Sequence, residues 1–314
     1  MKTVAVTGIS GYLGTGILQR LEKRDDVETI IGMDIKPPQV MSPKLKFVTH
    51  DIREPFGRVF SDNKVDCAIH LAFAVRPTHD YKGARAIDID GAKNFIEACE
   101  QANVKRLLYL SSNTAYGPNS DNPDYLTEDM PLRPTPGFLY SWDKGEADQM
   151  FQDFMKENPE YCVTIVRACP VLGPRGGGSV SAGMYQMVMM RLQGYNPQLQ
   201  YLHEDDLADI LTMLIMQEQP GIFNAAADGP LSYKEVIALT GKRCIVLPSW
   251  FITPILSFTW NLHLQSASPP GGLDFIKYPV VLSNEKLKKT TGYQFRYTTK
   301  ETLMAFLEAG KSKK

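Results

Sequence analysis

The chain has 314 residues and a mass of 35.1 kDa, and 43% of its residues are hydrophobic, so it can bury one large core or two small ones. This composition excludes a disordered protein. Lysines and arginines number 34 against 35 aspartates and glutamates, so the net charge of -1 creates no global field that favours nucleic acid or an anionic membrane. We therefore expect small-molecule partners.

The cysteines and the apolar segments indicate the compartment. The five cysteines contain no Cys-x-x-Cys pair and sit mostly in apolar runs, so we interpret them as reduced and buried in a cytoplasmic protein. The first residues, Met1–Gly8, reach glycine too early for a secretory signal and are typical of a first strand. Ile245–Leu262 is apolar, but Pro248 and Pro254 interrupt it. A core or pocket-lining segment is favoured there over a membrane span or a membrane-resting helix, and no membrane insertion is expected.

Short aliphatic and β-branched runs alternate with amphipathic helical patterns from the start of the chain. This alternation predicts an α/β fold with a doubly wound, Rossmann-like parallel sheet and helices on both of its faces. The helical patterns carry apolar residues three and four positions apart. The expected strands are Thr3–Thr7, Thr29–Asp34, Lys46–Thr49, Cys67–Leu71, Arg106–Leu110 and Cys162–Arg167, and the expected helices are Tyr12–Lys23, Ala92–Ala102 and Leu139–Lys156.

After Arg167 the regular alternation decays. Gly173–Gly178 is a loop by composition, and a helix is expected over Met184–Leu192, where the methionines fill core space or form an adaptable pocket. A further strand is expected over Gly221–Ala225. We predict that residues 1–175, with a return near 199–225, form the sheet domain. A smaller C-terminal region, made of residues 176–198 and 226–314, would cover it.

The first expected strand runs into Thr7-Gly8-Ile9-Ser10-Gly11-Tyr12-Leu13-Gly14, a Gly-x-x-Gly-x-x-Gly turn that opens the first helix. Gly8 would make the tight turn, Gly11 would let the backbone approach a pyrophosphate, and Gly14 would let helix and strand pack closely. The helix N-terminus would then face the phosphates. By itself the pattern fits an ordinary loop equally well.

Further strand ends fall at the same edge of the predicted sheet. Asp34 ends the second strand 20 residues after Gly14, the usual distance for a carboxylate that binds the adenosine ribose. It would favour NAD over NADP, although a plain turn residue is the simpler alternative. Asp51-Ile52 ends the third strand and His70-Leu71-Ala72 the fourth, at the carboxyl edge where ligands bind in open α/β sheets.

Tyr140 and Lys144 are four residues apart, so on a helix they share one face. A phenol has an ordinary pKa near 10, too high for a base at neutral pH, and a neighbouring ammonium is expected to lower it. The spacing alone also fits a solvated helix face. Ser111 and Ser112 end the fifth strand, where a hydroxyl can hold a substrate oxygen or cap a turn.

The order of these motifs resembles that of the extended short-chain dehydrogenases, a family of nucleotide-sugar epimerases and dehydratases and of related hydroxysteroid and dihydroflavonol dehydrogenases. The likeness covers most of the chain. It implies NAD as cofactor and a homodimer formed through the helices near Ala92–Ala102 and Leu139–Lys156. It rests on Thr7–Gly14, Asp34, Asp51-Ile52, His70-Leu71-Ala72, Ser111-Ser112 before Tyr116-Gly117, Tyr140 to Lys144, Arg167 through Pro170 to Gly173-Pro174, and His203–Ala208, which resembles a helix start that caps rather than reacts.

The resemblance implies hydride transfer at the nicotinamide C4. Tyr140 would take or give the hydroxyl proton, and Lys144 would lower the pKa of Tyr140 and hold the nicotinamide ribose. Ser112, rather than Ser111, would hold the substrate oxygen. The sheet domain would bind NAD and the smaller region the substrate. The implied cofactor contacts are Gly8, Gly11, Tyr12, Leu13, Gly14, Asp34, Asp51, Ile52, Leu71, Ala72, Lys144 and Pro170, and the implied substrate contacts are Ser112, Asn113, Thr114, Tyr140 and Arg175.

Three departures from the family pattern bear on the substrate. Asn113-Thr114 stands where family dehydratases usually carry Asp-Glu, so the acid pair that eliminates water is missing. Leu199 stands where nucleotide-sugar members usually carry an arginine, and Asp88 where the family has an asparagine. Arg175 or Arg191 could supply a pyrophosphate clamp instead.

Aromatic residues near the C-terminus favour an apolar site, which suits a hydrophobic or small hydroxy or keto compound; these are Trp250, Phe251, Phe258 and Trp260. We therefore expect an NAD-dependent oxidoreductase of secondary alcohols or ketones. A nucleotide-sugar epimerase and a non-catalytic NAD-binding regulator are the alternatives. The five histidines show no zinc-like spacing, and no Gly-x-Ser-x-Gly elbow is present, so neither a metal site nor a serine hydrolase is expected.

Overall fold

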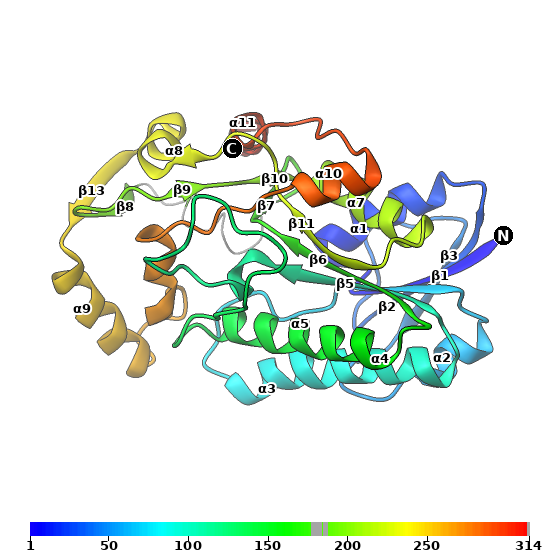
Figure 1. Ribbon diagram of the computed structural model, residues 1–314. Helices are drawn as coiled ribbons and strands as arrows, with labels where there is room; N and C mark the ends of the chain where they lie inside the picture. The colour runs from blue at the N-terminus through cyan, green and yellow to red at the C-terminus, as the bar shows by residue number, and fades with distance from the viewer. Residues whose placement is uncertain (177–183, 185–187, 313–314) are drawn as a thin grey trace.

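A parallel sheet of seven strands forms the centre of the protein, which is described by a computed structural model for residues 1–176, 184 and 188–312 (Figure 1). The strand order is β3-β2-β1-β4-β5-β6-β11. The inner strands are aliphatic and buried on both faces, as expected of a parallel sheet. The Rossmann-like fold is confirmed. The strands are β1 (Lys2–Thr7), β2 (Val27–Asp34), β3 (Leu45–Thr49), β4 (Cys67–His70), β5 (Arg106–Ser112), β6 (Cys162–Ala168) and β11 (Gly221–Ala225).

Helices cover both faces of this sheet and bury two separate apolar layers. α1 and α7 pack together on one face, while α2, α4 and α5 cover the other (Figure 1). A one-turn helix and a π-helix, which often occurs at functional sites, lead directly into α4. The bounds are α1 (Tyr12–Glu22), α2 (Gly57–Asp62), α3 (Tyr81–Arg85), η1 (Ala86–Asp90), α4 (Gly91–Gln101), α5 (Leu139–Glu157) and α7 (Glu204–Met216).

The strand order reverses between β1 and β4, so the loops that follow these two strands turn toward opposite faces of the sheet. Such a reversal leaves a crevice at the carboxyl ends of the strands. In this chain that edge carries the glycine turn after β1, Asp34 at the end of β2 and Ser112 at the end of β5. The topology therefore places the predicted motifs around one crevice.

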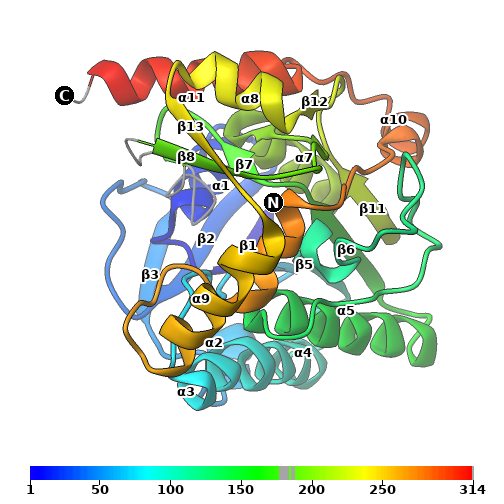
Figure 2. The same ribbon diagram turned by 90° about the vertical axis from the view of Figure 1, so that its left-hand side faces the viewer.

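The rest of the chain forms three two-stranded sheets and further helices with a third apolar core. α8 and α11 lie together on the side of the molecule opposite α4 and α5 (Figure 2). The remaining elements are β7 (Val171–Leu172), β8 (Val188–Leu192), β9 (Gln198–Leu199), β10 (Leu202–His203), β12 (Leu231–Ser232), α8 (Tyr233–Thr240), β13 (Arg243–Leu247), α9 (Ser249–Asn261), η2 (Asn113–Ala115), η3 (Pro270–Ile276), α10 (Glu285–Thr291) and α11 (Thr299–Ser312).

The expected helix over Met184–Leu192 is wrong for residues 188–192, whereas Met184 is helical. Residues 188–192 form β8, which pairs in parallel with β13, while residues 185–187 lie outside the described residues. Pairing with the β-branched partner strand overrides the helix preference of methionine. Met184 and Met189 are buried in the third core, so they fill core space.

Two expectations of burial also need correction. Cys244 is exposed on β13 and Cys162 is half-buried, whereas Cys67, Cys99 and Cys169 are buried. The apolar segment Ile245–Leu262 lies largely on the surface because α9 packs outside all three cores, and only its Trp260 is buried. Among the described residues, none of the helices is both long and apolar enough to cross a membrane.

Candidate functional site

A cavity of about 770 Å³ lies at the carboxyl edge of the sheet. Its walls come from the glycine turn, from the ends of the strands β2 to β6 and from the start of α5. All twelve residues expected to contact the cofactor line it, and so do Ser112, Asn113, Thr114 and Tyr140. Arg175 is not among the lining residues. The topology thus brings together motifs that are spread over more than half of the sequence.

The glycine turn leaves no room for side chains. Gly8 has a φ of +72°, and a Cβ added there would lie 2.8 Å from the backbone nitrogen of Ala72. A Cβ on Gly14 would lie 2.4 Å from the carbonyl oxygens of Gly8 and Ile9, so helix and strand meet backbone to backbone. Gly11 caps α1 without a side-chain hydrogen bond. No side chain at position 11 caps the first N–H groups of α1, and the first residues of this helix line the cavity. These N–H groups can therefore bind a pyrophosphate.

Asp34 stands on the cavity wall at the end of β2. Its carboxylate accepts hydrogen bonds from the backbone nitrogens of Ser10 at 3.1 Å and Ile35 at 2.8 Å. A carboxylate has about four lone-pair sites, so it keeps acceptor capacity for ribose hydroxyls. Asp51 is paired with Arg53, whose guanidinium holds the pKa of that carboxyl below its ordinary value. These features fit a dinucleotide with an unmodified ribose.

Tyr140 and Lys144 lie one helical turn apart near the start of α5, as the spacing predicted. The Lys144 Nζ donates to the carbonyl oxygen of Leu110 at 2.7 Å and lies 3.5 Å from the centroid of the Phe73 ring. Burial lowers the pKa of Lys144 to about 7, against the opposing charges of Asp88 and Asp148. The buried amine is therefore poised to gain or lose a proton near neutral pH.

The pKa of Tyr140 departs in the direction opposite to the expected one. Burial raises it to about 12, and hydrogen bonding to the side chain of Ser112 only partly opposes this. Lys144 does not lower it, because its Nζ is turned toward the Leu110 carbonyl and lies 6.0 Å from the centroid of the Tyr140 ring. In this state the phenol is protonated at neutral pH and is a proton donor.

The two serines at the end of β5 have different partners. The Ser111 hydroxyl donates to Asp148 at 2.5 Å, and Asp148 forms a fully buried ion pair with Arg167 at 2.8 Å. The Ser112 hydroxyl accepts from the backbone nitrogen of Thr114 at 3.2 Å and from the Thr114 hydroxyl at 3.0 Å. Both serines line the cavity, but the Ser111 hydroxyl is committed to a structural network, whereas Ser112 lies beside Tyr140.

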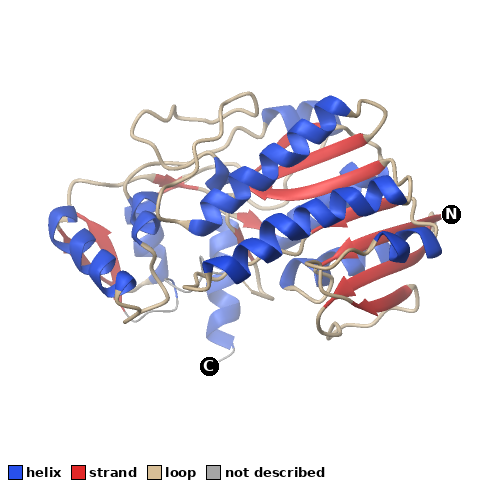
Figure 3. Ribbon diagram, turned by 90° about the horizontal axis from the view of Figure 1, so that it is seen from below, coloured by secondary structure: helices blue, strands red, loops and turns tan. Residues whose placement is uncertain are grey.

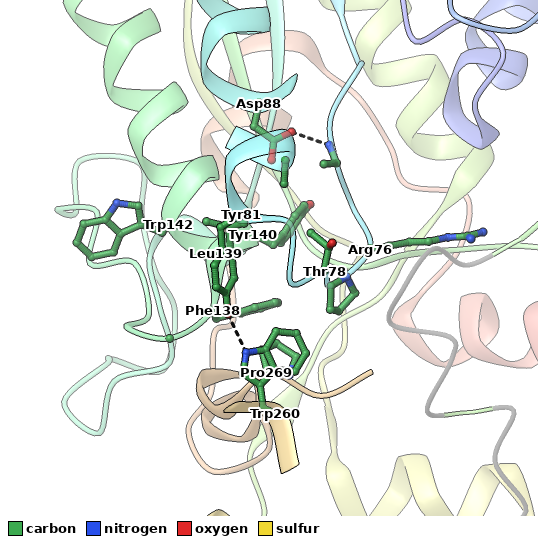
Figure 4. Close-up of a pocket in the computed structure, with 14 residues that line it drawn as sticks. Arg76, Thr78, Tyr81, Asp88, Phe138, Leu139, Tyr140, Trp142, Trp260 and Pro269 are labelled. Carbon is green, nitrogen blue, oxygen red and sulfur yellow. Dashed lines mark hydrogen bonds between the residues drawn. The ribbon is translucent and has the colours of Figure 1, made fainter. Parts of the chain in front are cut away.

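A second cavity, of about 320 Å³, adjoins the first one at Tyr140 (Figure 4). Its walls are mostly apolar and bring the start of α5 against α9 and the loop after β4. Trp260 of α9 donates from Nε1 to the hydroxyl of Tyr81 at 2.8 Å, which ties α9 to α3. Its apolar lining residues include Phe138, Leu139, Trp142, Trp260, Pro77 and Pro269.

Arg76, Phe73 and Asp88 are among the cavity residues that the sequence did not predict. Arg76 lines both cavities and follows β4 by six residues, a loop position without a sequence signal. Phe73 contacts Lys144 from the same loop. Asp88, noted before only as a departure, is buried in η1 and accepts from the backbone nitrogen of Ala74 at 2.6 Å (Figure 4). Burial raises the pKa of Asp88 to about 7.

Other predicted residues lie away from the cavities. Arg175 pairs with Glu204 at 3.2 Å and Asp205 at 2.8 Å, beside the start of α7. Asp205 donates its backbone N–H to His203 Nδ1 at 3.1 Å, which confirms the predicted capping role of this motif. Arg191 donates to the carbonyl oxygen of Tyr195. Within the described residues, no group of three metal-ligating side chains could hold a metal ion.

Similarity to known proteins agrees with this geometry. Residues 4–226 match the NAD dependent epimerase/dehydratase family. An uncharacterized protein of Mycobacterium tuberculosis is 26% identical over 96% of this chain and 82% of its own length. A 3 beta-hydroxysteroid dehydrogenase/Delta 5-->4-isomerase of Vaccinia virus is 31% identical over 48% of this chain and 45% of its own. The structure of Thermus thermophilus UDP-glucose 4-epimerase in complex with NAD shares the fold, with a TM-score of 0.76, 18% identity and coverage of 98% and 99%.

The family match spans more than two thirds of the chain and includes the glycine turn, Asp34, Ser112, Tyr140 and Lys144. The chain therefore belongs to the NAD dependent epimerase/dehydratase family, and it is an NAD-dependent enzyme.

Proposed function

We propose that this enzyme transfers a hydride between NAD and a secondary alcohol or ketone that binds in the second cavity. The observation that carries this proposal is the position of Tyr140, which lines both cavities. Its hydroxyl thus lies where a cofactor in the larger cavity and a substrate in the smaller one would meet. Ser112 lies next to it, and Lys144 follows it by one helical turn.

The three side chains would divide the proton chemistry. NAD supplies the hydride donor or acceptor at C4 of the nicotinamide. Tyr140, protonated at neutral pH because of its burial, would donate its proton to a ketone oxygen in the reducing direction. The Ser112 hydroxyl would hold the same oxygen. Lys144, buried and with a lowered pKa, would replace that proton and fix the cofactor ribose.

The walls of the second cavity favour a mainly apolar substrate. Its volume of about 320 Å³ is at the lower end for ligand sites, and seven of its fourteen lining residues are aromatic or proline. Arg175, the clamp considered for a pyrophosphate, is already paired with Glu204 and Asp205. Of the four aromatics expected around the site, only Trp260 lines either of the two described cavities; Trp250, Phe251 and Phe258 are exposed and lend no support.

A nucleotide-sugar epimerase is the second candidate function, and Arg76 is the observation that favours it. This arginine lines both cavities, and no ion pair holds its side chain among the described residues. An unpaired guanidinium there could bind a phosphate bidentately. A non-catalytic regulator is no longer a candidate, because the family is one of enzymes.

A substrate screen separates the two functions. The purified chain with NAD would be assayed against hydroxysteroids, hydroxy acids and other secondary alcohols, and in parallel against UDP- and dTDP-sugars. We expect NADH formation with an apolar secondary alcohol and none with the sugars. Saturable epimerisation of a nucleotide sugar at micromolar concentration would replace the first proposal by the second.

We further propose the division of labour predicted for the chain. Residues 1–175 with the return near 199–225 would bind NAD, and residues 176–198 and 226–314 would cover the substrate. A cytoplasmic homodimer formed through α4 and α5 is the proposed assembly. Sedimentation of the purified chain tests the dimer, and a monomer at micromolar concentration would contradict it.

A further inference from the structure

An apolar surface extends over β13, α9 and the turn that follows them, and we call it the α9 surface. Half of the exposed large hydrophobic side chains in the described part of the chain, 8 of 16, lie between residues 245 and 264. Trp250 is 77% exposed and Phe258 is 63% exposed. Exposed apolar residues that gather in one segment in this way mark interaction sites. The α9 surface consists of Ile245, Val246, Trp250, Phe251, Ile255, Phe258, Leu262 and Leu264.

The segment of the chain that contains the α9 surface carries charges of one sign. From residue 236 to residue 273 the sequence has no aspartate or glutamate, and its only lysine and arginine are Lys242 and Arg243. Both precede α9; Arg243 is the first residue of β13 and is exposed, and Lys242 comes directly before it. A second copy of this chain would bring cations toward cations. An anionic lipid surface supplies the opposite charge together with an apolar phase.

The position of α9 leaves its apolar side chains accessible to a flat surface. In Figures 1 and 3 it lies at the end of the molecule opposite the N-terminus, beyond the central sheet. Trp260, its buried residue, lines the second cavity and is tied to Tyr81. The α9 surface is therefore continuous with the wall of the proposed substrate chamber.

We propose that the α9 surface docks the enzyme onto an anionic lipid bilayer, with α9 lying in the plane of the interface. The helix has 13 residues, whereas a membrane span needs about 20, so it rests on the bilayer rather than crossing it. Trp250 and Phe258 would enter the acyl boundary, and Arg243 would meet lipid phosphates. The docking does not rest on the proposed reaction. The corollary that an apolar alcohol reaches the chamber from the bilayer does rest on the proposed reaction.

Vesicle flotation of the full chain tests the docking. The purified protein would be mixed with vesicles of phosphatidylcholine and phosphatidylglycerol, and with vesicles of phosphatidylcholine alone. We expect the chain to float with the anionic vesicles and to be released by high salt. The double variant Trp250→Ser/Phe258→Ser should reduce the vesicle partition coefficient on the order of tenfold or more. Arg243→Gln should weaken binding to the anionic vesicles alone.

A matched control replaces exposed apolar residues elsewhere. Met41 and Tyr125 are 63% and 49% exposed, so Met41→Ser/Tyr125→Ser removes similar surface and should float like the unaltered chain. Retained NAD binding by every variant would show that each one is folded. Absence of flotation by the unaltered chain overturns the proposal. A second outcome also overturns it: the unaltered chain sediments as a dimer and binds no vesicles, and the Trp250→Ser/Phe258→Ser variant sediments as a monomer. A second copy would then cover the surface.

Discussion

The hydroxyl of Ser111 donates to the Asp148 carboxylate at 2.5 Å, whereas the hydroxyl of the next residue, Ser112, receives hydrogen bonds only from Thr114 among the described donors. Adjacent residues on a strand point to opposite faces of a sheet. Both serines line the cavity, but the same dipeptide commits the Ser111 hydroxyl to the buried network with Arg167 and leaves the Ser112 hydroxyl outside that network.

We predict that the two serine variants affect different properties. Ser112→Ala should lower kcat by about 100-fold with little effect on the free energy of unfolding, because the lost hydroxyl faces the substrate. Ser111→Ala should keep most of the activity but lower the free energy of unfolding by about 2 kcal/mol, the usual value of a hydrogen bond to a charged group. Steady-state kinetics and urea unfolding of both variants measure this. A loss of turnover confined to Ser111→Ala would reverse the assignment.

Removing the phenolic hydroxyl should abolish proton transfer without disturbing the cofactor. Tyr140→Phe is expected to bind NAD with an unchanged Kd and to lower kcat by at least about 100-fold, the low end of general acid–base contributions. Tyr125→Phe, at an exposed position outside both cavities, is the control and should be unaffected. Near-normal turnover by Tyr140→Phe would exclude Tyr140 as the acid.

Asp88→Asn should shift the pH dependence of catalysis. The Asp88 carboxylate raises the pKa of Lys144, and Asp148 acts in the same direction, while burial lowers it. Without the Asp88 charge the ammonium is less stable, so the pKa of Lys144 falls further. If catalysis uses protonated Lys144, activity is present below this pKa and is lost as pH rises through it. The alkaline limb of kcat/KM should therefore move to lower pH in Asp88→Asn.

The kinetic profile needs a structural control. Asp88 also accepts the backbone N–H of Ala74, and an asparagine oxygen can keep this bond. Asp88→Asn should therefore have a Tm close to that of the unaltered protein while its pH profile shifts. An unchanged alkaline limb would show that the Asp88 charge does not act on the proton of Lys144.

Much of the fold and of the larger cavity followed from local rules. Each motif of the cofactor cavity is a strand end or the turn after it, and parallel strands bring such ends to one edge. That is why Gly8, Asp34 and Ser112 could be placed together from sequence positions alone. The choice of Ser112 over Ser111 came from the family spacing, and the hydrogen bonds of Ser111 support it.

The smaller cavity could not be predicted because its walls depend on tertiary packing. Tyr81, Phe138 and Trp260 come from three distant segments, and no spacing relates them. The same limit applies to Met184–Leu192, where strand pairing decides the structure of residues 188–192. It applies equally to α9, because hydrophobicity alone does not reveal whether an apolar helix is covered. The direction of the Tyr140 pKa likewise depends on burial that spacing does not encode.

The cofactor preference should depend on Asp34. Its carboxylate would repel the 2′-phosphate of NADP, so NAD should bind more tightly. Asp34→Ser removes the charge, and Ser10 and Ile35 lose an acceptor for their N–H groups. We expect this variant to lose NAD affinity by about tenfold or more, because a charged hydrogen bond is worth about 1.5–3 kcal/mol. The preference for NAD over NADP should become smaller. Titration with both cofactors measures it. Tighter NADPH binding by the unaltered chain would contradict the role of Asp34.

Arg76→Gln distinguishes the two candidate functions at a single position. If the substrate is an uncharged secondary alcohol, the loss of this guanidinium should change its KM by less than about twofold, since no charged hydrogen bond is lost. If the substrate carries a pyrophosphate, KM should rise by about tenfold or more, because one bidentate arginine contact disappears. Arg76 also lines the cofactor cavity, so the Kd of NAD must be measured for the same variant. A tenfold rise in KM with an unchanged Kd for NAD would favour the nucleotide-sugar epimerase. An unchanged KM would support the alcohol or ketone, since the apolar walls around Tyr140 would then supply the binding.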